Sequence, residues 1–309
     1  MSLEALEVML KSVMGYATPL ILAALGGMYT AKVAVLNFSL EGIMIMGACM
    51  GCYGSWLTGS AWGGALFGML GGLSMALVLG FASIETKVNQ VVAGTGVNVL
   101  GLGLSIFLSS MIYGAAGQPT KVAAFSPVAI PGLSRLPLIG QMLFYQHPLT
   151  YIMYGVIVVS WFVIYKTPFG LNMRAVGDHP AAADSLGIHV NHLRWKAVVI
   201  SGLLGGLAGA ALSIGSLSTF QENMTAGRGY LAWGVVTVGK WNPFGILLAG
   251  LLFGCGEAVQ MRLQMDGFHI PYQFLCMLPY ILTMLVVNGV IGKSEPPFAM
   301  GKPFIKGEK

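Results

Sequence analysis

Five polar residues stand inside or beside long apolar stretches of this sequence, where such groups are costly and are therefore functional candidates. They are Asn37, Glu41, Asn98, Glu222 and Arg228. Asn37 and Glu41 could hydrogen-bond a polar solute, or Glu41 could brace the start of a helix, where negative charge is stabilising. Asn98 suits either a contact with a solute or a hydrogen bond between helices. Glu222 and Arg228 could pair with each other and hold a re-entrant turn.

The sequence contains no motif that indicates an enzyme. Cys49 and Cys52 have the C-x2-C spacing of zinc and redox sites, but they lie in an apolar stretch without a second pair, so we expect buried thiols. The sequence has no G-x-S-x-G elbow and no Walker A motif, so we expect no catalytic residue, no metal site and no ATP hydrolysis by this chain. The five histidines lie in loops or at the edges of apolar stretches: His147, His179, His189, His192 and His269.

The composition requires a membrane around the elements that carry these residues. The chain has 309 residues, of which 56% are hydrophobic and only 9% are charged, and its mean hydropathy is +0.77. A soluble domain has about 25% charged residues. The 44 glycines lie within apolar stretches, as expected where helices pack closely in a bilayer. The net charge of +5 is spread over the ends of apolar stretches, which argues against nucleic-acid binding.

We therefore predict an all-α, polytopic transmembrane bundle of about nine segments, with a range of about 8–10. The seventh segment, 218–240, begins too polar to face lipid and is expected to be broken or re-entrant. The other expected spans are 16–30, 38–57, 62–84, 91–113, 149–165, 197–217, 244–261 and 271–291.

A single transmembrane domain is expected over residues 1–292. The bias of Lys and Arg places the 166–196 loop and the 293–309 tail in the cytoplasm, and the 114–147 loop and the N-terminus outside. The first span and its successor share a pattern with the sixth and seventh: a Gly/Ala-rich helix, a polar break and a second apolar stretch. A shift of five spans reverses orientation, so this pattern predicts an inverted repeat of the kind found in transporters.

The 166–196 loop contains a short helix that is suited to docking. Pro180 fits the first turn of a helix, and Gly187 can end it in a left-handed conformation. The small apolar face between them favours contact with a partner protein over an ordinary solvated loop. The expected docking residues are Pro180, Ala181, Ala182, Ala183, Leu186 and Gly187.

Several sequence blocks, in the same order along 15–292, resemble one family. The run GDHPAAADSLGIHVNHLRWK, at 177–196, is similar to the coupling loop of ABC importer permeases of the branched-chain amino acid and simple-sugar (ribose-type) group. The blocks VLNFSLEG (35–42), TAGRGYLAWG (225–234) and GKWNP (239–243) resemble further blocks of that group. With NQVVAGT (89–95), the set is most similar to the nucleoside branch, although Phe38 and Trp233 depart from the residues expected there.

The resemblance implies a permease subunit of an ATP-driven importer in the cell membrane of a prokaryotic-type cell. The expected partners are cytoplasmic ABC ATPase subunits, an identical or paralogous second permease and an extracellular solute-binding protein. ATP would bind to the ATPase subunits, and this chain would hold no cofactor. The 180–187 helix would enter the ATPase cleft. In such a permease the five polar residues are the candidates for the translocation path, because polar groups are costly inside a membrane. The alternatives are a simple-sugar permease of the same group and, in another class, an ion-coupled secondary transporter.

Overall fold

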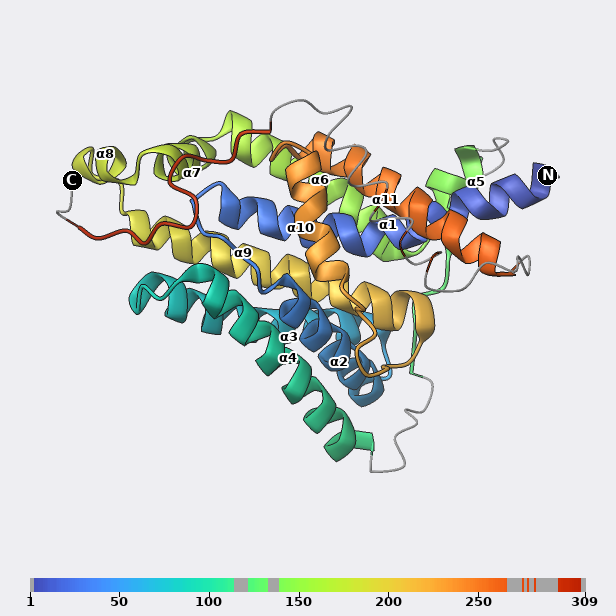
Figure 1. Cartoon of the computed structure of the whole chain (residues 1–309). Coiled ribbons are helices and arrows are strands. Elements are labelled where there is room, and N and C mark those ends of the chain that lie inside the picture. Colours follow the sequence, from blue (N-terminus) through green and yellow to red (C-terminus); the bar gives the residue numbers. More distant parts are fainter. Residues whose placement is uncertain are drawn as a thin grey trace.

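The structure, a computed structural model, describes residues 3–113, 122–132, 139–265, 274, 277, 281 and 294–306. Helices dominate it (Figure 1). Within the described residues, six helical segments are long and apolar enough to cross a bilayer: Glu7–Ala31, Ala61–Glu85, Gln90–Ile112, Pro148–Lys166, Val190–Leu217 and Pro243–Met265. The chain is thus a multi-pass, all-α membrane protein, as its composition predicts.

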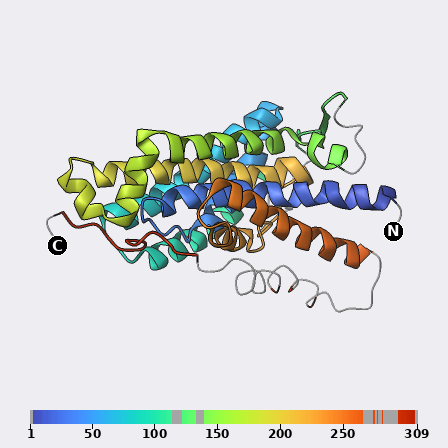
Figure 2. The same ribbon diagram turned by 90° about the horizontal axis from the view of Figure 1, so that it is seen from above.

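The bundle is organised around two long helices, α1 (Leu3–Ala31) and α9 (Val190–Ala210), which lie against each other (Figures 1 and 2). A π-helical segment, η3 (Ala211–Leu217), continues α9. Glycines allow the close contact: a Cβ atom on Gly26 of α1 would lie 3.0 Å from the carbonyl oxygen of Ser201 in α9. Small residues at helix contacts let backbones approach and gain dispersion energy inside a bilayer, where the hydrophobic effect between helices is absent.

A second group of helices packs on α9 from another side. It contains α2 (Leu40–Thr58), α3 (Ala61–Gly80) with its π-helical end η1 (Phe81–Glu85), and α4 (Gln90–Tyr113). A Cβ atom on Gly47 of α2 would lie only 2.5 Å from the carbonyl oxygen of Gly206 in α9, so a larger residue there would separate the helices. Figure 1 shows this group diverging from the layer of α1, α6 and α11.

The remaining elements lie at the two ends of the bundle and beside α1. Helices α6 (Pro148–Lys166), α10 (Arg228–Val238) and α11 (Pro243–Met265) pack on the α1 side. Near the start of α1 are the short helix α5 (Ile139–Phe144) and a two-stranded antiparallel pair, β1 (Val128–Ala129) with β2 (Tyr145–Gln146). Helices α7 (Pro168–Asp178) and α8 (Pro180–Ser185) lie at the opposite end, together with 294–306 (Figure 1).

The structure differs from the sequence expectations at several boundaries. Helix α1 begins at Leu3, well before 16, because the amphipathic start continues the same helix. Helix α9 begins at Val190, so the 166–196 loop contains α7, α8 and the first turns of α9. The expected span 271–291 lies outside the described residues except at 274, 277 and 281. The count of nine spans, the domain limits and the inverted repeat stay predictions.

The seventh segment is broken, as its polar start predicts. Residues 218–227 are not helical, and α10 has 11 residues. A helix of that length rises about 16 Å, roughly half of the hydrocarbon thickness. The backbone between α1 and α2, at 32–39, is also not helical.

Candidate functional site

Side chains from distant helices hold the break between α1 and α2. The amide nitrogen of Leu36 donates to Gln90 Oε1 at 2.7 Å, and Asn37 Nδ2 donates to Ser201 Oγ at 2.9 Å. Asn37 Oδ1 also accepts from the backbone and the hydroxyl of Ser39. Backbone polar groups that are buried outside a helix need partners elsewhere in the protein. Asn37 is therefore a bracing residue of this break.

Glu41, in the first turn of α2, caps the start of α10. Its Oε1 accepts from the Gly227 amide at 2.8 Å, and its Oε2 accepts from the Gly229 amide at 2.6 Å. The first amides of a helix have no partners within the helix, and a carboxylate there also meets the positive end of the helix dipole. Of the two roles considered for Glu41, the structure therefore supports the bracing of a helix start, although the helix is α10.

The glycines of the 225–234 block explain why α10 can reach this carboxylate. Gly227 has a φ of 84°, a left-handed conformation that glycine adopts without strain. A Cβ atom on Gly229 would collide with the backbone nitrogen of Glu41. Both glycines are thus required for the starts of α2 and α10 to meet.

Asn98 of α4 also hydrogen-bonds the backbone at the start of a helix, here α2. Its Oδ1 accepts from the Gly42 amide at 2.8 Å, an amide in the first turn of α2. Its Nδ2 donates to the carbonyl oxygen of Phe38 at 2.8 Å and to the hydroxyl of Tyr230 at 2.9 Å. Asn98 therefore joins α4, the α1–α2 break and α10 by interhelical hydrogen bonds. Phe38 and Trp233, which depart from the expected residues, contact each other with ring centroids 5.6 Å apart.

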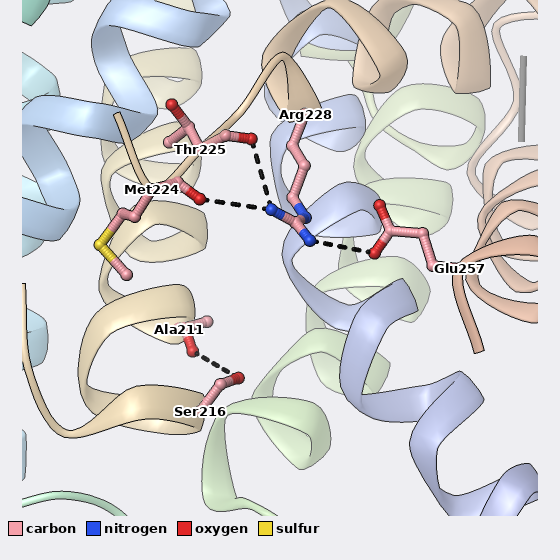
Figure 3. Close-up of polar contacts among 6 residues, drawn as sticks. All are labelled: Ala211, Ser216, Met224, Thr225, Arg228 and Glu257. Carbon is pink, nitrogen blue, oxygen red and sulfur yellow. Dashed lines mark hydrogen bonds and ion pairs between the residues drawn. The ribbon is translucent and has the colours of Figure 1, made fainter. Parts of the chain in front are cut away.

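Arg228 forms its ion pair with a residue other than the one expected. Figure 3 shows its guanidinium between the 218–227 turn and α11, where Nη2 lies 3.3 Å from Glu257 Oε2. Nη1 donates to the carbonyl oxygens of Met224 and Thr225 at 3.3 and 3.5 Å. Arg228 pairs with Glu257 while Glu222 lies exposed on the turn, so the expected pairing of Glu222 with Arg228 is wrong. Glu257 takes that place because α11 runs beside the start of α10.

We predict that Arg228 and Glu257 stabilise the protein as a pair. Their side chains are 23% and 11% exposed, so removing one leaves the other partly desolvated without its counter-charge. We expect Arg228→Met and Glu257→Gln each to lower the free energy of unfolding by about 1–3 kcal/mol, and the double variant to cost less than the sum. Thermal unfolding of the purified protein in detergent measures this coupling, and strictly additive losses would contradict it.

The surface formed by α7 and α8 is exposed and partly apolar. Thr167 Oγ1 accepts from the Gly170 amide and caps α7, and Pro180 occupies the first turn of α8. Gly187 ends the α8 turn with a φ of 84°, as the sequence predicts. Ala183 is buried against the bundle, whereas Leu186 is 81% exposed, the largest exposure among the large hydrophobic side chains described.

The three alanines of α8 lie on two different faces of the helix, one exposed and one buried. Ala181 and Ala182 are exposed beside Leu186, and only Ala183 turns inward. The sequence predicts that these residues belong to a loop outside the bilayer, where lipid would not cover them.

The two cysteines and one cavity complete the description of the polar groups. Within the described part of the chain, no group of three or more His, Cys, Asp or Glu side chains is placed to hold a metal ion. Cys49 and Cys52 are buried in α2 as free thiols. A cavity of 230 Å³ opens beside α8, lined by Lys87, Asp184, His189, Val190, Asn191, His192, Phe304 and Lys306.

Arg194 is a buried charge that the sequence did not lead us to expect. Arg194 of α9 is 1% exposed, although it lies in a stretch expected to be a cytoplasmic loop. Its Nη2 donates to the carbonyl oxygen of Lys302 at 3.2 Å. The spacing of Val190, Arg194, Ala197 and Ser201 places Arg194 on the buried stripe of α9, and this helical period was the signal that could have revealed it.

The described helices, six of them long and apolar enough to span a bilayer, are those of a polytopic membrane protein. The chain belongs to the family described as "Branched-chain amino acid transport system / permease component", whose model matches residues 9–287. A guanosine ABC transporter permease protein of Bacillus subtilis is 37% identical over 99% of both chains. A nucleoside ABC transporter permease protein of Lactococcus lactis is 34% identical, also over 99% of both. A candidate glucose ABC transporter permease protein of Haloferax volcanii is 34% identical over 90% of both.

Proposed function

We propose that this chain is the membrane-spanning subunit of an ATP-driven importer of nucleosides. The observation that carries this proposal is the full-length similarity to permeases named for guanosine and for nucleosides. The glucose permease at 34% identity favours a simple sugar as the second candidate. An ion-coupled carrier, the remaining alternative, has no support from these relatives.

The exposed face of α8 is the proposed contact with a cytoplasmic ABC ATPase. Its alanines and Leu186 would enter a cleft on that subunit, and ATP would be bound and hydrolysed there, so the permease itself would need no cofactor. Movement of α8 would pass through α7 to α6 and α9, on which α7 packs. Alternating access then follows from the two halves of the bundle rocking against each other.

The polar residues at the starts of α2 and α10 are proposed to shape the translocation path. Asn37, Glu41 and Asn98 fix the starts of α2 and α10, and Arg228 fixes the turn before α10. In secondary transporters, solute binds where helices are interrupted, and we propose a comparable place for it here. Glu222, which is exposed on the turn, is the member of the set that is free of the bracing contacts described above and is best placed to meet solute.

The proposal also includes the other partners of an importer. An extracellular solute-binding protein would deliver the nucleoside, and a second permease, identical or paralogous, would complete the path. The contact with the binding protein would lie near the start of α1 and α5, at the end of the bundle opposite α8 (Figure 1).

Uptake by proteoliposomes tests this function. The vesicles would contain this chain with its cognate second permease and ATPase, and the binding protein would be outside. We expect labelled guanosine, adenosine or uridine to accumulate only with ATP inside. Accumulation of glucose or ribose alone would support an ATP-driven importer but would refute nucleosides as its substrates. Uptake that follows an ion gradient and ignores ATP would refute the importer.

A further inference from the structure

The segment 294–306 crosses the end of the bundle that carries α7 and α8, and it contacts four elements in turn. Ser294 Oγ donates to the carbonyl oxygen of Thr237, in the last turn of α10, at 2.9 Å. Further along, the Ala299 amide donates to the carbonyl oxygen of Gly177 in α7 at 3.1 Å. These hydrogen bonds hold the segment against the bundle.

Two further contacts seat the second half of the segment. The Gly301 amide donates to the carbonyl oxygen of Ala34, at the α1–α2 break, at 3.1 Å. The carbonyl oxygen of Lys302 accepts from Arg194 of α9. Both Ala34 and Gly301 have left-handed φ angles, of 61° and 77°, so the backbone at this junction is closely specified on both sides.

The segment also flanks the start of α8. The rings of Phe298 and His179 lie with their centroids 5.7 Å apart, and His179 is the residue that joins α7 to α8. A Cβ atom on Gly177 would collide with the carbonyl oxygen of Lys32 and would lie 3.4 Å from Pro297. The end of α7 is therefore held between the end of α1 and this segment.

Arg194 gives the segment its strongest attachment. The side chain is almost fully buried, its Nε has no partner among the described residues, and its Nη2 donates to Lys302. A hydrogen bond from a charged donor is stronger than a neutral one, and a buried charge deprived of its acceptor is costly. The charge of Arg194 thus favours the seated position of the segment over a released one.

We propose that residues 294–306 form a transmission strap, which passes the movement of α7 and α8 to the α1–α2 break and to the end of α10, with Arg194 as its positioning residue. The strap reaches α10 at its last turn, while Glu41 holds its first turn, so α10 would respond at both ends. This proposal rests on the proposed function, in which α8 receives the ATPase movement.

The number of nucleoside molecules imported per ATP hydrolysed tests the strap in the reconstituted complex. We expect Arg194→Gln, and a chain ended after residue 293, to hydrolyse ATP while this ratio falls by about tenfold, the factor that corresponds to one charge-assisted hydrogen bond. Arg194→Lys keeps a charged donor and is expected to restore most of the ratio. Lys196→Gln, which neutralises an exposed cation two residues further along α9, is the matched control and should leave the ratio unchanged.

A ratio makes the result independent of the amount of folded protein, because a merely structural defect lowers uptake and hydrolysis together. An unchanged ratio in Arg194→Gln would overturn the strap. If the Arg194 variants do not assemble, Ser294→Ala decides, since it removes only the contact with α10, and an unchanged ratio there would equally overturn the proposal. Absence of ATP-driven uptake with the unaltered chain would instead refute the proposed function.

Discussion

Replacement of Glu41 by Gln is expected to abolish solute uptake and to destabilise the protein. The carboxylate accepts two short hydrogen bonds from the backbone of α10, at Gly227 and Gly229. An amide retains one acceptor and turns an NH2 group towards the other backbone donor. Hydrogen bonds to charged groups contribute about 1.5–3 kcal/mol each, so we expect a loss of about 3 kcal/mol in the free energy of unfolding.

Thermal unfolding in detergent and ATP-driven uptake in vesicles measure the two effects of Glu41→Gln. The matched control is Glu222→Gln, the same change at an exposed carboxylate on the turn before α10, and it should leave stability unaltered. Uptake by that control also tests Glu222 as a solute contact. A Glu41→Gln protein as stable as the unaltered chain would show that the capping of α10 by this carboxylate is dispensable.

Replacement of Ala182 by Arg is expected to stop ATP-driven uptake while leaving the permease folded. Ala182 is exposed on α8, next to the exposed Leu186. We therefore expect the longer arginine side chain to fit without a steric clash within this chain. In an apolar cleft on the ATPase it would introduce bulk and an unpaired charge, which partner surfaces reject strongly. We expect uptake to fall by at least about tenfold, a loss of about 1.4 kcal/mol or more in docking.

Co-purification of the ATPase with the permease separates loss of docking from loss of transport. Ala175→Arg, the same change at an exposed alanine on α7, serves as the control, and it should keep both the ATPase and uptake. Normal uptake by Ala182→Arg would contradict the docking of α8. Failure of both variants would extend the contact surface to α7.

Much of the fold could be predicted because composition and apolar length report directly on the bilayer. The sequence determined the membrane class, and it placed α2, α3, α4, α6 and α11 within a few residues of their observed bounds. Pro180 and Gly187 marked α8, since proline and glycine act on the local backbone whatever surrounds it. The polar start of 218–240 likewise predicted an interrupted helix, because lipid cannot satisfy that backbone.

Only the tertiary structure decided which residues meet. Glu41 and Gly229 are 188 residues apart, yet their hydrogen bond joins the starts of α2 and α10. A helical period shows that a face is buried but does not show which helix covers it. From the sequence, Glu222 was the expected partner of Arg228, but the packing of α11 places Glu257 there instead. Arg194 was missed for the same reason, because its acceptor lies on a segment 108 residues away. Such partners depend on non-local helix packing, which the local chemistry of the chain does not specify.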